Sequence, residues 1–225
     1  MIFTIITQKG KITLNVKLLT STQSIHDMEH FAALAALTCH ANTDKMSNED
    51  YLPSDTLKNI IKAGHESILE HINLTFKIEG LSRACLQELA RHRHISLSVE
   101  STRHTLLKKL YGSWEELNSA LIGKKVPKLE FKNINLDLRK WIICFLEKIC
   151  YQYPEMTNDE LKYFLPEFWP TNLIITLNVR EFRHILKLRT APAALKEFRI
   201  LARSMFHEVP DEFKYLLQDC VHEEE

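Results

Sequence analysis

Hydrophobic residues alternate with polar ones in some segments and recur at helical spacing in others, which predicts a mixed structure. Residues 72–80 give the clearest strand, with apolar positions on one side and polar positions on the other. Residues 1–19 indicate two β-rich runs joined at Lys9-Gly10, a predicted hairpin, and residues 171–178 indicate another strand. The predicted buried side of the first strand is Ile72, Leu74, Phe76 and Ile78.

Helical spacing accounts for much of the remaining chain. Terminal signals support several helices: Ser24 with Asp27 suits a helix start, Gly64 a helix end, and Pro192 a first turn. Thr157 and Glu160 have the spacing of a capping box before residues 161–166. The predicted helices span residues 25–41, 54–64, 81–93, 136–153, 179–189 and 192–206. In the helix at 136–153, the predicted inward side is Leu138, Trp141, Ile142, Phe145 and Ile149.

This order of elements predicts one α+β domain over residues 1–225. It would be a helix-rich domain around a small, mainly antiparallel sheet. The polar, irregular residues 112–135 suggest a peripheral excursion from that domain.

Charge and cysteine content narrow the classes of protein. Lys+Arg and Asp+Glu each total 29, so anion binding requires local clusters rather than a general positive charge. The five cysteines form no CxxC pair, and residues 1–19, interrupted by polar residues every few positions, do not have the pattern of a signal peptide. No apolar run approaches the roughly 20 residues needed to span a bilayer. We therefore expect a cytoplasmic protein with reduced thiols and no membrane partner.

One segment, RHRHISLSVESTRH at residues 91–104, concentrates cationic and hydroxyl groups. Arg91, Arg93, Ser101 and Arg103 could form a phosphate cradle, because a guanidinium binds phosphate with two hydrogen bonds. A solvated basic face or an ion-pair network with glutamates is an alternative explanation. A nucleic-acid-binding module is another, although the segment lacks interleaved aromatic residues for base stacking.

A second cluster, NVREFRHILKLR, spans residues 178–189. Arg180, His184 and Leu188 would share one helical face, whereas Arg189 lies about 180° round from Arg180, so the two arginines would serve different ligands. An alternative is a surface helix with its other basic side chains, Arg183 and Lys187, in water, and with Asn178 as its N-cap.

Other familiar sites find little support. His65 and His71 are six residues apart and no HExxH motif is present, so we expect no metal site. No GxSxG elbow or glycine-rich nucleotide loop occurs. The residues alone thus indicate an α+β protein with anion sites suited to a nucleotide, without defining a reaction.

The arrangement R-H-R-x7-S, from Arg91 to Ser101, resembles the signature of the flavin-dependent thymidylate synthases. The segments GHESILEHINLTFKIEGLSRACLQELARHR and LPEFWPTNLIITLNVREFRHILKLR resemble the family before and after it, so the likeness covers roughly residues 55–110 and 155–205. It implies conversion of deoxyuridylate (dUMP) to thymidylate (dTMP), with methylenetetrahydrofolate as the carbon donor and NADPH as the reductant through bound FAD. It also implies a homotetramer with sites between subunits.

The same resemblance implies residue roles. Arg189 would be the catalytic residue that activates the uracil, since a guanidinium stabilises negative charge. Residues matching FAD-binding positions are Ser67, Arg91, His92, Arg93, Asn178, Arg180 and His184. Residues matching dUMP-binding positions are Glu88, Arg91, Val99, Glu100, Ser101, Arg103, Lys162 and Arg189.

The chain departs from the family pattern around the nucleotide. Glu88 replaces a common Gln, Ser98-Val99 replaces Asn-Glu with an acid following at Glu100, His104 replaces a frequent Tyr, and Lys162 replaces an Arg. These changes leave open a flavoprotein of the same fold that has lost methyl transfer.

Overall fold

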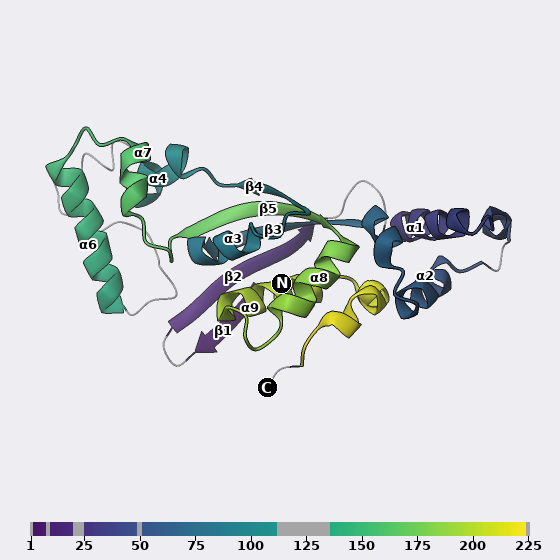
Figure 1. The fold of residues 1–225 in the computed structure, drawn as a ribbon. Coiled ribbons are helices and arrows are strands. Elements are labelled where there is room, and N and C mark those ends of the chain that lie inside the picture. The colour runs from purple at the N-terminus through teal and green to yellow at the C-terminus, as the bar shows by residue number, and fades with distance from the viewer. Residues whose placement is uncertain (1, 8–9, 20–24, 49–50, 112–135, 224–225) are drawn as a thin grey trace.

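The computed structural model describes residues 2–7, 10–19, 25–48, 51–111 and 136–223. The predicted Lys9-Gly10 turn, the Ser24 helix start and the excursion at 112–135 lie wholly or partly outside these residues. The molecule is elongated: α1 (Ile25–Cys39) and α2 (Pro53–Lys62) form one end, and α6 (Leu136–Gln152) stands at the other (Figure 1). A sheet with its covering helices lies between them.

The described residues form a five-stranded antiparallel sheet in the order β1-β2-β3-β5-β4. The central strands β3 and β5 bury every second side chain over most of their length, which confirms the alternation read from the sequence. The predicted α+β class with a small antiparallel sheet is therefore confirmed. The strands are β1 (Ile2–Thr7), β2 (Gly10–Leu19), β3 (Asn73–Ser82), β4 (Ile95–Val99) and β5 (Pro170–Asn178).

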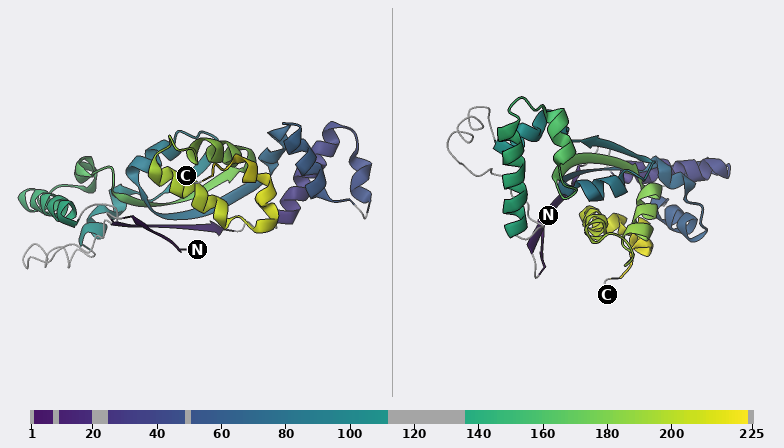
Figure 2. Two further views of the ribbon diagram at one scale, coloured as in Figure 1. Left: turned by 90° about the horizontal axis from the view of Figure 1, so that it is seen from below. Right: turned by 60° about the vertical axis from the view of Figure 1, so that its left-hand side comes forward.

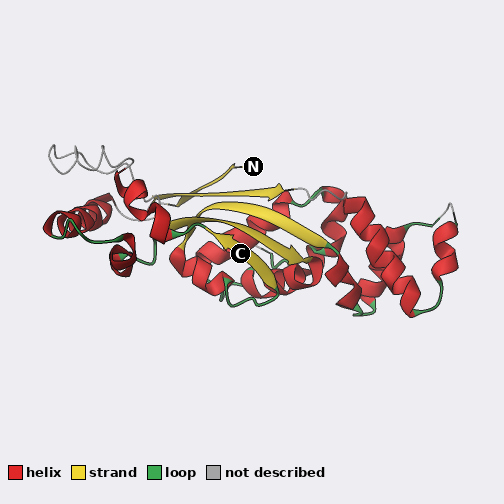
Figure 3. Ribbon diagram, turned by 90° about the horizontal axis from the view of Figure 1, so that it is seen from above, coloured by secondary structure: helices red, strands yellow, loops and turns green. Residues whose placement is uncertain are grey.

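Helices cover one face of this sheet. Figures 2 and 3 show α3 (Arg83–Leu89), α8 (Val179–Arg189) and α9 (Lys196–Glu208) on the same side of the strands. Phe76 of β3 meets Phe182 of α8 edge to face, with ring centroids 5.6 Å apart. The remaining described helices are α4 (Thr102–Tyr111), α7 (Asn158–Leu161) and the 3₁₀ helices η1 (Thr43–Ser47), η2 (Glu66–His71), η3 (Lys162–Phe164), η4 (Asp211–Leu216) and η5 (Gln218–Cys220).

Two predicted helices have wrong boundaries. Strand β3 continues through Ser82, and α3 begins only at Arg83 because the Ser82 hydroxyl accepts a hydrogen bond from the Cys85 amide at 3.1 Å and caps the helix. The chain then turns into β4 instead of remaining helical to residue 93. Helix α9 begins at Lys196, so Pro192 precedes the helix. The helix α4 was not predicted.

The inward side predicted for α6 is only partly correct. Ile149 is buried and Ile142 is partly buried, but Trp141 and Phe145 are 75% and 47% exposed. The buried side instead includes Leu146 and Cys150, which pack in a second cluster with Leu106 of α4 and Leu161 of α7. The long helix has apolar residues on more than one side, and α4 and α7 cover only one of them. The side chain of Leu138 lies outside the described set.

Within the described residues, no helix is both long enough and apolar enough to cross a membrane.

Candidate functional site

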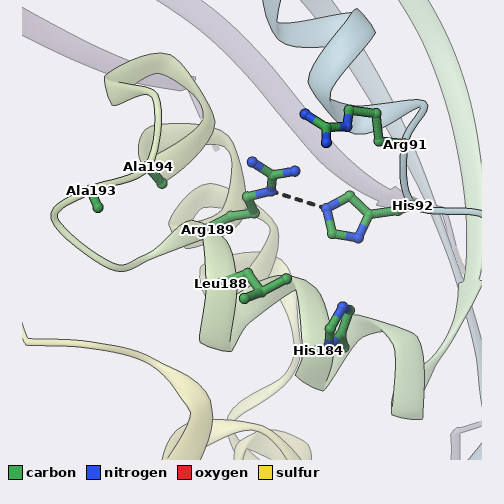
Figure 4. A pocket seen from close by; sticks show the side chains of 7 residues that line it. All are labelled: Arg91, His92, His184, Leu188, Arg189, Ala193 and Ala194. Atoms are coloured by element: carbon green, nitrogen blue, oxygen red, sulfur yellow. Dashed lines mark hydrogen bonds between the residues drawn. The ribbon is translucent and has the colours of Figure 1, made fainter.

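A pocket of about 420 Å³ opens between the turn that follows α3 and the C-terminal half of α8. Figure 4 shows the Arg91, His92 and Arg189 side chains grouped on one side of it, with His184 and Leu188 along the same helix as Arg189. The pocket therefore joins the two cationic clusters identified in the sequence. Its lining is Arg91, His92, His184, Leu188, Arg189, Ala193 and Ala194.

Local structure explains how α8 presents these groups. The Asn178 side chain accepts a hydrogen bond from the Glu181 amide at 2.8 Å, so Asn178 is the helix N-cap. Helical spacing then places His184 and Leu188 one turn apart on the pocket side. The next residue, Arg189, ends the helix and reaches back toward His92.

His92 lies between two charged side chains and is only 6% exposed. Arg189 Nε lies 3.0 Å from His92 Nε2, and because a guanidinium can only donate, that imidazole nitrogen must accept. The proton of the neutral ring is then on Nδ1, which lies 3.1 Å from Glu181 Oε1 and donates to it. Burial lowers the pKa of His92, and the Arg189 charge adds to this, whereas Glu181 opposes it. These contacts fix a neutral imidazole with a defined tautomer.

Arg189 is held by three different kinds of contact. Besides its bond to His92, its Nη1 donates to Glu88 Oε2 at 3.0 Å, and its guanidinium carbon lies 4.7 Å from the Phe198 ring centre. Its side chain is 18% exposed, so part of the guanidinium faces the pocket. Glu88 also lies 3.5 Å from Arg91 and thus sits between the two arginines. A fixed, partly desolvated cation can stabilise negative charge that develops on a bound molecule.

The buried thiol of Cys85 is not prepared for nucleophilic attack. Burial raises its pKa well above the ordinary range, and the nearby Glu197 charge adds to this effect.

The residues expected to bind FAD are only partly brought together. Arg91, His92 and His184 line the pocket, and Arg93 follows in the same exposed turn. Asn178 caps α8, and Arg180, at the start of that helix, donates to Glu70 at 2.5 Å. Ser67 is exposed on η2, outside the residues that line the pocket.

The residues expected to bind the nucleotide divide into two groups. Glu88, Arg91 and Arg189 are at the pocket. The others lie along β4 and toward α4 and α7: Arg103 forms a two-bond pair with Asp159 at 2.7 and 3.0 Å, and Glu100 accepts from Asn172 at 2.8 Å. Val99 ends β4, and the exposed Ser101 and Lys162 precede α4 and begin η3. One chain therefore holds two separate, incomplete groups of nucleotide-binding candidates.

Two charged residues with clear structural roles were missed by sequence reasoning. The surface-helix alternative put Arg183 in water, but its side chain is 2% exposed and pairs with Glu66 and Asp219. Lys187 is exposed, as that alternative expected. Glu181 accepts a hydrogen bond from His92 and so orients its ring. The one local sequence signal for a role of Glu181 was its position in the first helical turn after the N-cap Asn178. The partners of Arg183 come from distant segments, so no local pattern indicates its burial.

The described residues contain no group of three or more His, Cys, Asp or Glu side chains able to hold a metal ion.

Comparisons with known proteins identify the family. The family described as thymidylate synthase complementing protein matches residues 17–213. Flavin-dependent thymidylate synthases from Campylobacter jejuni (38% identical over 72% of this chain and 78% of the relative) and Wolinella succinogenes (35% over 92% and 100%) are similar to it.

Solved structures give the same result at the level of the fold. Thymidylate synthase X from Helicobacter pylori, crystallised with FAD and dUMP, superposes with a TM-score of 0.70 and 29% identity, covering 93% of this chain and all of that one. The UMP/dUMP methylase PolB from Streptomyces cacaoi, 17% identical with a TM-score of 0.57, shares the fold, with 86% of this chain and 88% of that one covered. The matched residues span most of the chain, and it therefore belongs to the flavin-dependent thymidylate synthase family.

Proposed function

We propose that this chain catalyses the FAD-dependent reductive methylation of dUMP to dTMP, with methylenetetrahydrofolate as the carbon donor and NADPH as the reductant. The observation that carries the proposal is the Arg189 guanidinium, oriented by neutral His92 and partly open to the pocket. The relatives named as flavin-dependent thymidylate synthases and the H. pylori structure with FAD and dUMP support it.

The chemistry of the pocket suits parts of both ligands. Exposed Arg91 can pair with a phosphate, and Leu188, Ala193 and Ala194 offer an apolar wall for a flat ring. Other residues that match FAD-binding positions, such as Ser67 and Arg180, lie outside this lining. The phosphate-binding candidates Ser101 and Arg103 lie apart from Arg189, so a complete nucleotide site needs a second chain, which is consistent with sites between the subunits of a homotetramer.

Each side chain has a role in this proposal. Ser67, Arg91, His92, Arg93, Asn178, Arg180 and His184 hold FAD, which when bound supplies the redox chemistry of the reaction. Arg91, Ser101 and Arg103 bind the dUMP phosphate, and Lys162 adds positive charge. Arg189 stabilises negative charge on the uracil, the catalytic contribution. Glu88, Val99 and Glu100 adjoin the nucleotide.

One observation favours a second candidate function. The Glu88 carboxylate lies 3.0 Å from Arg189, and an anion so close offsets the positive charge that would activate the base. A flavoprotein of this fold without methyl transfer is consistent with that pair. The nucleic-acid alternative finds no support among the relatives, which are named as flavin-dependent thymidylate synthases.

A visible absorption titration with FAD, with and without dUMP, tests the proposal. We expect a bound-flavin spectrum that shifts when dUMP is added, followed by dTMP formation once methylenetetrahydrofolate and NADPH are supplied. Flavin and dUMP binding without dTMP would favour the second candidate. A protein that retains no FAD under either condition would contradict both.

The variant Arg189→Ala tests the assignment of the catalytic residue. We expect retained FAD and a turnover number lower by about 10²- to 10³-fold, the effect of removing one group that stabilises developing charge. Turnover and FAD affinity would be measured on the same preparation, with Lys45→Ala, an exposed cation of η1, as the control. Unchanged turnover would remove Arg189 from the catalytic step.

A further inference from the structure

Arg183 is a buried cation whose hydrogen-bonding capacity is fully used. Its Nε and Nη2 donate to Glu66 Oε1 at 3.1 and 2.9 Å. Its Nη1 and Nη2 donate to the two Asp219 oxygens, each at 2.6 Å, and Nη1 also donates to the Leu216 carbonyl at 2.5 Å. A guanidinium carries five N–H groups, and these five bonds occupy them. Arg183 is thus fixed in position as well as in charge.

The partners of Arg183 come from two separate segments. Glu66 begins η2 and directly precedes Ser67, whereas Leu216 and Asp219 belong to the C-terminal segment of η4 and η5. Arg183 itself lies in the middle of α8. One side chain therefore joins η2, α8 and the C-terminal segment.

Other contacts reinforce both junctions of α8. On the C-terminal side, the His222 amide donates to Thr190 Oγ1 at 2.9 Å, and His222 Nε2 lies 3.0 Å from the Lys187 carbonyl. The contacts between α8 and η2 are more numerous. Arg180 donates to Glu70 at 2.5 Å, Lys187 Nζ lies 3.6 Å from Glu66, and the Val179 amide donates to the Ile72 carbonyl at 2.8 Å. We refer to Glu66, Glu70, Arg180, Arg183 and Lys187 as the α8–η2 seam.

Burial makes Arg183 the dominant member of the seam. The Arg180–Glu70 pair is about half exposed on both sides, and exposed pairs contribute little to stability. The Arg183 side chain is 2% exposed, and removing one partner of a buried charge is far more disruptive. Burial acts to lower the pKa of Arg183, but its hydrogen bonds to Asp219 and Glu66 outweigh this and raise it. The residue stays charged and therefore needs its carboxylates.

Helix geometry links this seam to the pocket. Successive residues of an α-helix point about 100° apart, so Arg183 faces η2 while His184 faces the pocket. Because Ser67 lies on η2 and His184 and Arg189 lie on α8, the contacts of the α8–η2 seam also fix the position of Ser67 relative to His184 and Arg189.

We propose that Arg183, acting through Glu66, is a positioning residue that sets the η2 segment carrying Ser67 at the flavin subsite. This inference rests on the proposed function, because it gives Ser67 and His184 a common ligand. Asp219 shares the guanidinium but holds the C-terminal segment, so it stabilises the fold without positioning η2.

The variants Glu66→Gln and Asp219→Asn form a matched pair that tests the proposal. Each replaces one carboxylate on the same guanidinium by its amide, so comparable losses of thermal stability are expected. Glu66→Gln should raise the FAD dissociation constant by about tenfold, the loss of one charged hydrogen bond, and Asp219→Asn by less than about threefold. FAD affinity would be measured by flavin fluorescence and stability by thermal unfolding without FAD.

Amide hydrogen exchange gives a second readout that does not depend on a bound ligand. Glu66→Gln should speed exchange in residues 66–71, and Asp219→Asn in residues 216–220. Equal effects of the two variants on FAD affinity, or unchanged exchange in residues 66–71 in Glu66→Gln, would overturn the positioning role. A wild-type chain that does not bind FAD would overturn the proposed function, and the exchange measurement would still decide whether Glu66 fixes η2.

Discussion

At the scale of single residues, the contacts of His92 determine its protonation state. Arg189 can only donate to the imidazole, and Glu181 accepts from the opposite nitrogen. Protonation of His92 would put a second N–H against the Arg189 donor and break that hydrogen bond. The charged groups next to the His92 ring are Glu181 and Arg189. The ring centres of His92 and His184 are 5.8 Å apart. The orientation of Arg189 is therefore tied to a neutral His92.

We expect His92 to titrate below the ordinary histidine pKa of about 6.5. Burial and Arg189 disfavour the charged imidazole, so the folded state binds this proton less readily than the unfolded state. The unfolded state then takes up more protons as the pH falls below the ordinary value, and His92 makes the fold less stable there. NMR titration of the His92 ring in the folded protein, compared with the urea-unfolded protein, measures the shift.

The variant Glu181→Gln separates the causes of this shift. Since Glu181 opposes the lowering, its neutralisation should lower the His92 pKa further. A higher His92 pKa in that variant would show that burial and Arg189 do not control the titration.

At the scale of elements, Asn178 joins a strand to a helix and has two expected roles. It ends β5, and its side chain caps α8. The sequence reading allowed both an N-cap and, from the family resemblance, a contact with FAD. The cap is formed by atoms of the chain itself, so capping alone is sufficient reason for an Asn at this position.

Two substitutions of Asn178 distinguish these roles. Asn178→Ala should destabilise the protein by about 1 kcal/mol, because the Glu181 amide loses its acceptor. Asn178→Asp keeps an acceptor and places a negative charge at the helix N-terminus, so stability should be retained. Urea unfolding measures stability, and flavin fluorescence measures FAD affinity. Weaker FAD binding in the stable Asp variant would assign the side chain to the cofactor, and full stability of the Ala variant would rule out the cap.

Sequence patterns at this scale failed where a tertiary contact overrode a local period. Leu81 fits a helical spacing with Ala84 and Cys85, yet it is buried in β3, which pairs with β5 as far as Ser82. Ser82 also donates to Glu197 of α9 through both its amide and its hydroxyl, and this interaction fixes the strand end. Neither strand β5 nor Glu197 is near Leu81 in the sequence, so the boundary could not be read locally.

At the scale of the whole molecule, the two incomplete groups of nucleotide-binding candidates lie in different places. Arg189 lies at the pocket, whereas Arg103 lies on α4 beside Asp159 of α7. If subunits share their sites, Arg189 of one chain and Arg103 of another bind the same nucleotide.

Mixing two inactive variants tests this arrangement. Arg189→Ala and Arg103→Ala should each lose most activity alone, but joint refolding should restore activity in up to about a quarter of the sites. In an equal mixture assembled at random, half of the sites have an intact Arg189, and half of those also have an intact Arg103 from the neighbouring chain. Turnover of the mixture would be compared with each variant refolded alone. No recovery in a mixed oligomer would mean that one chain supplies both arginines.

The sequence by itself determined the class of fold, the central strands, most helices and the family. These follow from local periods and from the R-H-R-x7-S spacing, both of which are written in consecutive residues. Only the tertiary structure decided that Arg183 is buried, that Glu181 orients His92, and that Glu88 pairs with Arg189. Each of those contacts joins residues far apart in the chain. A buried charge needs a partner to compensate for its lost hydration, and the local sequence does not indicate which distant residue that partner is.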